Sequence, residues 1–391
     1  MEQSWRWFGP DDPVPLAHVR QAGATGIVTA LHHIYDGRAW SAEDIGTRKA
    51  MIEAAGLTWN VCESIPVHTA IKLRQGPYRQ YIDAWKDSLA ALGRAGIPTV
   101  CYNFMPVVDW TRTDLMYAMP STGRALRFDM LEFIAYDAFV LKRAGAESDY
   151  PQALLDRARS VVARKTEAEI AKLETNIIAG LPGGEDSYTR EAIGRRIASF
   201  DGVTPADMRA NLIAFLQEVV PVAEECGVKL AIHPDDPPFS LFGLPRIVST
   251  PDDAAAILAA VESPANGLTL CAGSYGSRPD NDVPAMAERF AARINFVHLR
   301  NVAKEPDGSF VESDHLDGDV DMVQLICVLL REERRRAAQG DKAPIPMRPD
   351  HGHLLGFDTE RRSNPGYSYI GRLKGLAELR GVMTTLEAMA V

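Results

Sequence analysis

The chain has 391 residues, 46% of them hydrophobic, so it can bury one large core or two or three smaller ones. A net charge of −10 argues against nucleic acid or an anionic membrane surface as a partner. No signal-peptide pattern and no apolar run near the roughly 18 residues that cross a membrane is visible. The five cysteines form no Cys-x-x-Cys pair, so we expect free thiols and a cytoplasmic location.

Short apolar runs alternate with helical patterns along the chain. The runs predict strands near residues 4–9, 26–31, 57–64, 98–105, 229–233, 268–272, 294–299 and 345–349. Helices are predicted at 42–55, 78–95, 205–226, 252–261 and 320–338. Eight such units in succession predict an α/β fold, a parallel (β/α)8 TIM barrel. The alternative is an open doubly wound sheet, which is disfavoured because no Gly-x-Gly-x-x-Gly fingerprint follows a strand.

Glycines mark several of the boundaries between helices and strands. Gly23, Gly56, Gly96 and Gly227 each follow a helical pattern and precede a strand. We expect them to end their helices, because glycine adopts the left-handed conformation that a helix C-terminus favours.

A long connection follows the fourth predicted strand. Residues of about 106–203 read as a helix-rich insertion, with helices at 129–144 and 150–178 and a loop at 179–187. Such an insertion must bury its apolar faces, so we expect it to cover the barrel mouth or to contact another subunit. No linker divides the chain, which predicts one domain spanning 1–391.

Four of the predicted strands end on a potential metal ligand. The ligands are His233, Cys271, His298 and Asp350. The C-terminal ends of barrel strands converge on one face, so these residues are expected to become neighbours. Imidazole, thiolate and carboxylate groups together suit a divalent transition ion. The alternative for each residue alone is a hydrogen-bonded position in the core.

Proton carriers are predicted beside this metal site. His351 follows Asp350 directly, and a neutral imidazole next to a divalent ion is a suitable acid or base near neutral pH. His353 is more readily interpreted as support for the metal. Tyr367 and Tyr369 lie in a Gly/Pro loop after the eighth strand, where a phenol can exchange a proton or simply pack.

Other polar residues follow the strands and are candidates for binding substrate. Asn103, Arg112 and Arg300 suit an anionic, polyhydroxylated ligand, and His315 joins them from the segment after the seventh strand. The acidic residues of 314–321 do not have the spacing of an EF-hand loop. No predicted strand ends on a lysine, which disfavours Schiff-base chemistry.

Several sequence blocks together resemble the mannonate dehydratase family of the UxuA type, within the xylose-isomerase-like barrels. The blocks are RWFGPDDPV at 6–14, LHHI at 31–34, ESIPVH at 63–68, NFMPVVDWTRTDL at 103–115, ESDHLDG at 312–318 and RPDHGH at 348–353. The resemblance spans nearly the whole chain.

The resemblance implies a metal-dependent hydro-lyase. The expected reaction converts D-mannonate to 2-dehydro-3-deoxy-D-gluconate in hexuronate breakdown, with Mn²⁺ or Fe²⁺. The family's metal ligands fall on His233, Cys271, His298 and Asp350, and its acid/base groups on His351 and Tyr367. We expect a homo-oligomer, a dimer or tetramer. The alternatives are a metal-dependent sugar isomerase or epimerase on the same barrel, and a barrel that binds a sugar acid without catalysis.

Overall fold

A computed structural model describes residues 1–178 and 189–389 of the chain. Eight parallel strands close into a barrel in the order β1-β12-β9-β8-β7-β4-β3-β2. They are β1 (Glu2–Arg6), β2 (Gly26–Thr29), β3 (Thr58–Glu63), β4 (Thr99–Tyr102), β7 (Lys229–Ile232), β8 (Asn266–Cys271), β9 (Ile294–His298) and β12 (Pro346–Arg348). Each coincides with a predicted strand, so the barrel prediction is confirmed.

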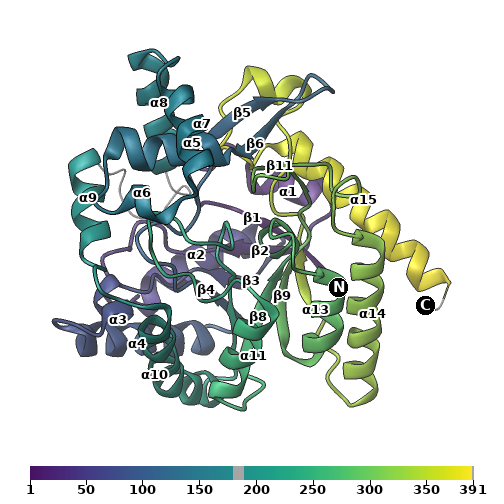
Figure 1. Cartoon of the computed structure of the whole chain (residues 1–391). Coiled ribbons are helices and arrows are strands. Elements are labelled where there is room, and N and C mark those ends of the chain that lie inside the picture. Colours follow the sequence, from purple (N-terminus) through teal and green to yellow (C-terminus); the bar gives the residue numbers. More distant parts are fainter. Residues whose placement is uncertain (179–188, 390–391) are drawn as a thin grey trace.

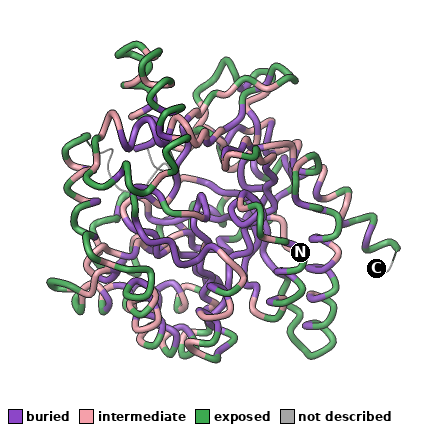
Figure 2. The backbone as a smooth tube through the Cα atoms, viewed as in Figure 1, coloured by how far each residue is buried: buried purple, intermediate pink, exposed green. Residues whose placement is uncertain are grey.

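Helices surround the barrel, as Figure 1 shows. Those between or after the barrel strands are α1 (Leu16–Gln21), α2 (Ala42–Ala54), α3 (Thr69–Leu73), α4 (Tyr78–Arg94), α10 (Pro205–Glu225), α11 (Pro251–Ala260), α12 (Ala272–Gly276), α13 (Val283–Phe290), α14 (Met322–Ala338) and α15 (Tyr369–Ala388). Their buried faces and the outward side chains of the strands form one large core, whereas the helices' outer faces are exposed (Figure 2).

Local sequence signals set the helix ends. Thr204 and Thr250 begin α10 and α11 with capping boxes to Asp207 and Asp253, each followed by a proline in the first turn. The four predicted terminating glycines have φ between 67° and 84°. These glycines therefore adopt the left-handed conformation expected after a helix.

A second, four-stranded sheet accompanies the barrel. It has the antiparallel order β10-β11-β6-β5, from β5 (Asp114–Ala118), β6 (Arg124–Phe128), β10 (Val302–Lys304) and β11 (Phe310–Glu312). The hairpin β5–β6 belongs to the long connection after β4, and β10–β11 to the connection after β9. The sheet thus joins two connections that are far apart in the sequence.

The helices of the insertion are more broken than predicted. They are α5 (Met130–Ile134), a π-helix (Ala135–Leu141), α6 (Ala146–Asp149), α7 (Gln152–Val162), α8 (Glu167–Ile178) and α9 (Arg190–Ala198). The single helix predicted at 150–178 is interrupted at 163–166, and the predicted loop at 179–187 lies outside the described residues. A separate small core includes Ile134, Ala138 and Leu155.

No helix in the described part of the chain is long and apolar enough to cross a membrane.

Candidate metal centre and acid/base site

Three predicted metal ligands meet at the C-terminal mouth of the barrel. His233 follows β7, Cys271 ends β8 and His298 ends β9, so the barrel's strand order makes them neighbours. Their ligand atoms all lie within 4.8 Å of one another, with His233 Nε2 3.2 Å from His298 Nδ1. The structure therefore brings together residues that are separated by 65 positions in the sequence.

Asp350 approaches the same cluster from β12. One carboxylate oxygen lies 3.9 Å from Nδ1 of His298, and another is paired with Arg348. The residue has a φ of 62°, a left-handed conformation in which the carboxylate turns toward the mouth at the end of its strand. Asp350 thus lies beside the cluster of the other three predicted ligands.

The electrostatics of Cys271 favour a thiolate. Burial would raise its pKa, but the positive charges of Arg300 and His233 outweigh burial and hold the pKa well below the ordinary value. The Ser274 hydroxyl, 3.0 Å from Sγ, also donates to the sulfur. A thiolate, two imidazoles and a carboxylate form a donor set that fits a divalent transition ion.

His351 and Tyr367 lie beside this cluster. Nε2 of His351 is 3.2 Å from the Tyr367 hydroxyl, and the two rings meet edge to face. Both residues are buried, and burial raises the pKa of Tyr367 well above its ordinary value. The phenol is therefore protonated near neutral pH and suited to donate a proton.

A closed ring of four charges lies behind the site. Arg112 and Arg300 each bind both Asp236 and Glu312, with shortest nitrogen–oxygen distances of 2.7–2.9 Å. Two cations and two anions cancel, so the buried group has no net charge and its main hydrogen bonds are satisfied. The ring touches both halves of the site, because Glu312 contacts His351 and Arg300 lies 3.6 Å from Sγ of Cys271.

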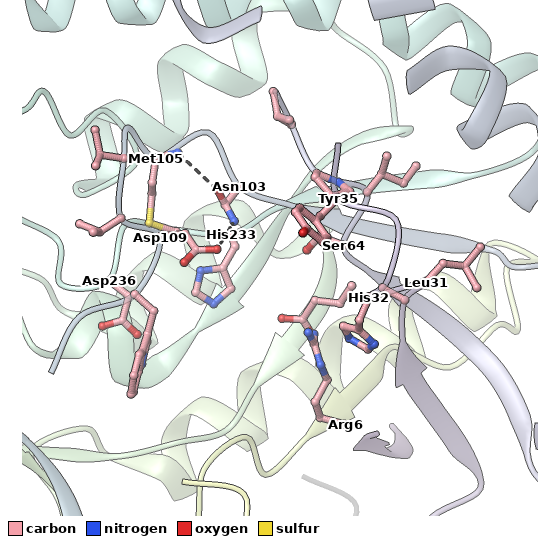
Figure 3. Close-up of a pocket in the computed structure, with 18 of the residues that line it drawn as sticks. Arg6, Leu31, His32, Tyr35, Ser64, Asn103, Met105, Asp109, His233 and Asp236 are labelled. Atoms are coloured by element: carbon pink, nitrogen blue, oxygen red, sulfur yellow. Dashed lines mark hydrogen bonds and ion pairs between the residues drawn. The ribbon is translucent and has the colours of Figure 1, made fainter. Parts of the chain in front are cut away.

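A cavity of about 140 Å³ opens beside His351 and Tyr367. Figure 3 shows His233, Asn103 and Asp236 on one side of it and Arg6 and His32 on the other. The predicted metal ligands His233 and Asp350 and the predicted proton carriers His351 and Tyr367 line it. A small ligand in this cavity would contact the two predicted proton carriers and two of the predicted metal ligands at the same time.

The structure separates the four residues predicted to bind substrate. Asn103 lines the cavity, and its side chain contacts Asp109 at 3.4 Å. Arg112 and Arg300 belong to the buried ring and are not among the residues that line the cavity. His315 is also buried, with Nε2 2.7 Å from the carbonyl of Pro349.

The two remaining candidates, His353 and Tyr369, lie near the site but are not among the residues that line the cavity. His353 is buried, with Nε2 2.8 Å from the carbonyl oxygen of Glu312. Tyr369 is half-buried at the start of α15 and packs on Trp5 at a ring distance of 6.0 Å. His353 therefore supports the segment that carries Asp350 and His351.

Sequence reasoning missed several charged residues of the site. Arg6, Glu63 and Arg348 end barrel strands, and Glu63 bridges the two arginines at 2.9 Å each. The rule that located the metal ligands, a polar residue at a strand end, also applies to these three. Glu312 carried no such signal, because it comes from the second sheet.

Comparisons with known proteins agree with one another. A family model described as D-mannonate dehydratase (UxuA) matches residues 1–391. The chain is 63% identical over 387 residues to mannonate dehydratase 2 of Agrobacterium fabrum, covering 99% of this chain and 98% of that protein. It is 56% identical over 391 residues to mannonate dehydratase of Saccharophagus degradans, covering 100% and 98%.

A solved structure is similar over the same length. The crystal structure of mannonate dehydratase from Streptococcus suis serotype 2 superposes with a TM-score of 0.78 at 34% sequence identity, and the match covers 100% of this chain and 96% of that one.

Proposed function

Because this chain belongs to the D-mannonate dehydratase (UxuA) family, we propose that it removes water from D-mannonate to give 2-dehydro-3-deoxy-D-gluconate. The observation that carries the proposal is that His351 and Tyr367 line one cavity together with two of the proposed metal ligands, His233 and Asp350. The relatives named above are dehydratases, which favours this reaction over the isomerase or epimerase alternative.

The reaction needs two proton transfers on neighbouring carbons. The proton on C2 lies next to a carboxylate and is too weakly acidic to leave in water, so a base must take it. The C3 hydroxyl is a poor leaving group, so an acid must protonate it as the C3–O bond breaks. The resulting enol becomes the 2-keto acid. His351 and Tyr367 are buried groups of the cavity that can fill these roles, each typically contributing about 10²–10⁴-fold.

We assign the metal site to His233, Cys271, His298 and Asp350, and propose Mn²⁺ or Fe²⁺ as its occupant. When bound there, a divalent ion would supply positive charge where negative charge develops beside the substrate carboxylate. The buried pairs of Arg348 with Glu63 and Asp350 hold the carboxylate of Asp350 in place.

We also propose a pathway, a cellular location and an oligomeric state for this protein. The reaction is that of hexuronate catabolism, which is where D-mannonate is consumed. All five cysteines are free, which supports a reducing, cytoplasmic setting. A homodimer or homotetramer is supported by exposed apolar side chains such as Phe357, 71% exposed, and Met116.

Turnover of D-mannonate tests the function directly. The purified protein, stripped of metal and reloaded with Mn²⁺, should convert D-mannonate to a 2-keto-3-deoxy acid that can be measured as its semicarbazone. The metal-stripped protein is the control and should be inactive until Mn²⁺ returns. Stoichiometric metal without any keto acid would contradict the proposal.

A further inference from the structure

Glu312 places its carboxylate against the histidine of the acid/base pair. Its Oε2 lies 2.7 Å from Nδ1 of His351, and its Oε1 lies 2.8 Å from the same atom. Among the described residues Oε2 hydrogen-bonds to His351 alone, whereas Oε1 also accepts from Arg112 and Arg300. One oxygen of this buried carboxylate is therefore dedicated to the imidazole.

The contacts with Glu312 favour a proton on Nδ1 of His351. A carboxylate can only accept, so Nδ1 must donate. Arg300 Nη1 also lies 3.1 Å from Nδ1, but a guanidinium can only donate, and Nη1 is directed to Glu312 Oε1 at 2.7 Å. Burial would raise the pKa of Glu312, but the guanidinium groups of Arg300 and Arg112 help to hold it below its ordinary value, so the carboxylate is ionised.

In an imidazole that carries its single proton on Nδ1, the other nitrogen, Nε2, has the lone pair. Nε2 lies 3.2 Å from the Tyr367 oxygen, and the protonated phenol can donate to it. Building on the proposed function, we propose that Glu312 is a positioning residue that holds His351 in the Nδ1–H tautomer. His351 Nε2 is then the base at C2, and Tyr367 is the acid at the C3 hydroxyl.

The proton balance of this assignment closes within the pair. Nε2 takes the C2 proton, and the electrons of the C–H bond form the C2–C3 double bond as the C3–O bond breaks. The Tyr367 O–H proton goes to the departing oxygen, which leaves as water. The phenolate then recovers a proton from the Nε2–H across the same 3.2 Å contact, which restores both groups.

The charged ring keeps Glu312 in position for this role. Arg112 and Arg300 bind its Oε1 from two connections of the barrel, after β4 and after β9. β11 is itself paired with β6 of the insertion, with Phe310 opposite Phe128. The insertion therefore supports the acid/base pair through the second sheet.

Nitrogen NMR of the histidines reads the tautomer directly. The protein, labelled with ¹⁵N-histidine and loaded with diamagnetic Zn²⁺, is recorded at alkaline pH, where imidazoles are neutral, and the His351 signal is identified by its absence in His351→Asn. We expect a protonated Nδ1 and an unprotonated Nε2. An Nε2–H tautomer in the wild-type protein would overturn the proposal, whatever the substrate is.

Matched variants distinguish the effect of Glu312 on the tautomer of His351 from its effect on the stability of the fold. Glu312→Gln and Asp236→Asn remove the same charge from the same ring, but only Glu312 touches His351. Both should lower the melting temperature, and Asp236→Asn should keep the Nδ1–H tautomer. Glu312→Gln should lose the tautomer preference and lower kcat at least about 10²-fold with little change in KM. Glu312→Asp keeps the charge and should restore the tautomer.

Each negative result has a distinct meaning. A Glu312→Gln protein with the wild-type tautomer and kcat would overturn the positioning role. An Asp236→Asn protein that loses the tautomer equally would assign the effect to the ring as a whole and also overturn it. Wild-type protein that shows the Nδ1–H tautomer but never consumes D-mannonate would instead contradict the proposed function alone.

Discussion

Tyr367 and His351 can each be replaced by a residue that preserves most of the packing but cannot carry a proton. Their substitution therefore separates the effect on chemistry from the effect on folding. Tyr367 lies between Phe8, at a ring distance of 4.8 Å, and His351, so a phenylalanine in its place keeps the same packing. His351 is fixed by Glu312 through one nitrogen, which an asparagine side chain can partly reproduce. Loss of either group should therefore affect chemistry more than folding.

We predict that Tyr367→Phe and His351→Asn each lower kcat by at least about 10²-fold, the smaller end of what a positioned proton carrier supplies. Both should keep one metal ion per chain and a similar melting temperature. Steady-state kinetics with D-mannonate and metal analysis check this. Near-normal kcat in Tyr367→Phe would make the phenol structural, and loss of metal in His351→Asn would make that residue a support of the metal.

The thiolate of Cys271 gives a second residue-level prediction. Cys271→Ala should bind less than one Mn²⁺ per chain, and added Mn²⁺ should no longer raise its melting temperature, because a ligand stabilises only the state that binds it. Cys327→Ala is the control, since Cys327 lies on α14 outside the cluster. Full occupancy with unchanged affinity in Cys271→Ala would remove Cys271 from the ligand set.

Helix α15 presses directly on the segment that carries Asp350 and His351. A Cβ at Gly371 would lie 2.0 Å from the carbonyl oxygen of His353, and a Cβ at Gly352 would lie 2.4 Å from the backbone of Gly371. These contacts are with backbone atoms, which cannot turn aside as a flexible side chain can. Two glycines therefore allow the helix and the catalytic segment to touch.

We predict that Gly371→Ala costs about 1–3 kcal/mol of stability, the usual penalty for overpacking, and displaces the catalytic segment enough to lower kcat/KM at least tenfold. Gly381→Ala is the matched control on the same helix, because a Cβ there meets no atom within 4 Å. That change should be neutral or stabilise by up to about 1 kcal/mol. Thermal melts and kinetics of both variants check this, and equal behaviour would contradict it.

The barrel strands were predictable and the second sheet was not, for a physical reason. A strand such as β8 is buried along its whole length, and its apolar residues Leu268, Leu270 and Cys271 mark it in the sequence. β5 is an edge strand with partly exposed residues, and β10 and β11 have three residues each, too few for a recognisable alternation. Their pairing depends on contacts between connections nearly 200 residues apart.

The same distinction applies to the site. The clustering of His233, Cys271 and His298 was predictable because the barrel alone forces strand ends together. Arg112 was expected to bind substrate, yet its guanidinium is committed to Asp236 and Glu312. Sequence shows that an arginine lies near the mouth, but its partner depends on side-chain geometry. Glu312 remained hidden because the sheet that carries it was missed.

At the scale of the whole molecule, the buried carboxylates make the fold sensitive to acid. Glu312 faces His351, Arg300 and Arg112, which together oppose burial and lower its pKa from 4.5 to about 2. A carboxyl with a depressed pKa in the folded state stabilises the fold above its unfolded pKa, and this contribution is lost as the pH falls. The loss should therefore extend from about pH 4.5 down toward pH 2.

We predict that the stability difference between wild type and Glu312→Gln shrinks as the pH falls from 5 toward 3. Other carboxyls titrate in both proteins, and taking the difference removes their common effect. Urea unfolding midpoints at several pH values measure it. A difference that stays constant or grows toward low pH would show that the pKa of Glu312 is not lowered in the folded protein.

The pairing of β1 with β12 also has a consequence for how the protein is made. Glu2 pairs with Pro346, so the barrel cannot close until nearly the whole chain has left the ribosome. At about 5–20 residues per second, the first strand waits roughly 20–70 s for its partner. During that time β1 presents an open hydrogen-bonding edge, and the last metal ligand, Asp350, has not yet been synthesised. The site is therefore among the last parts of the molecule to form, and the open edge of β1 is a liability for aggregation until then.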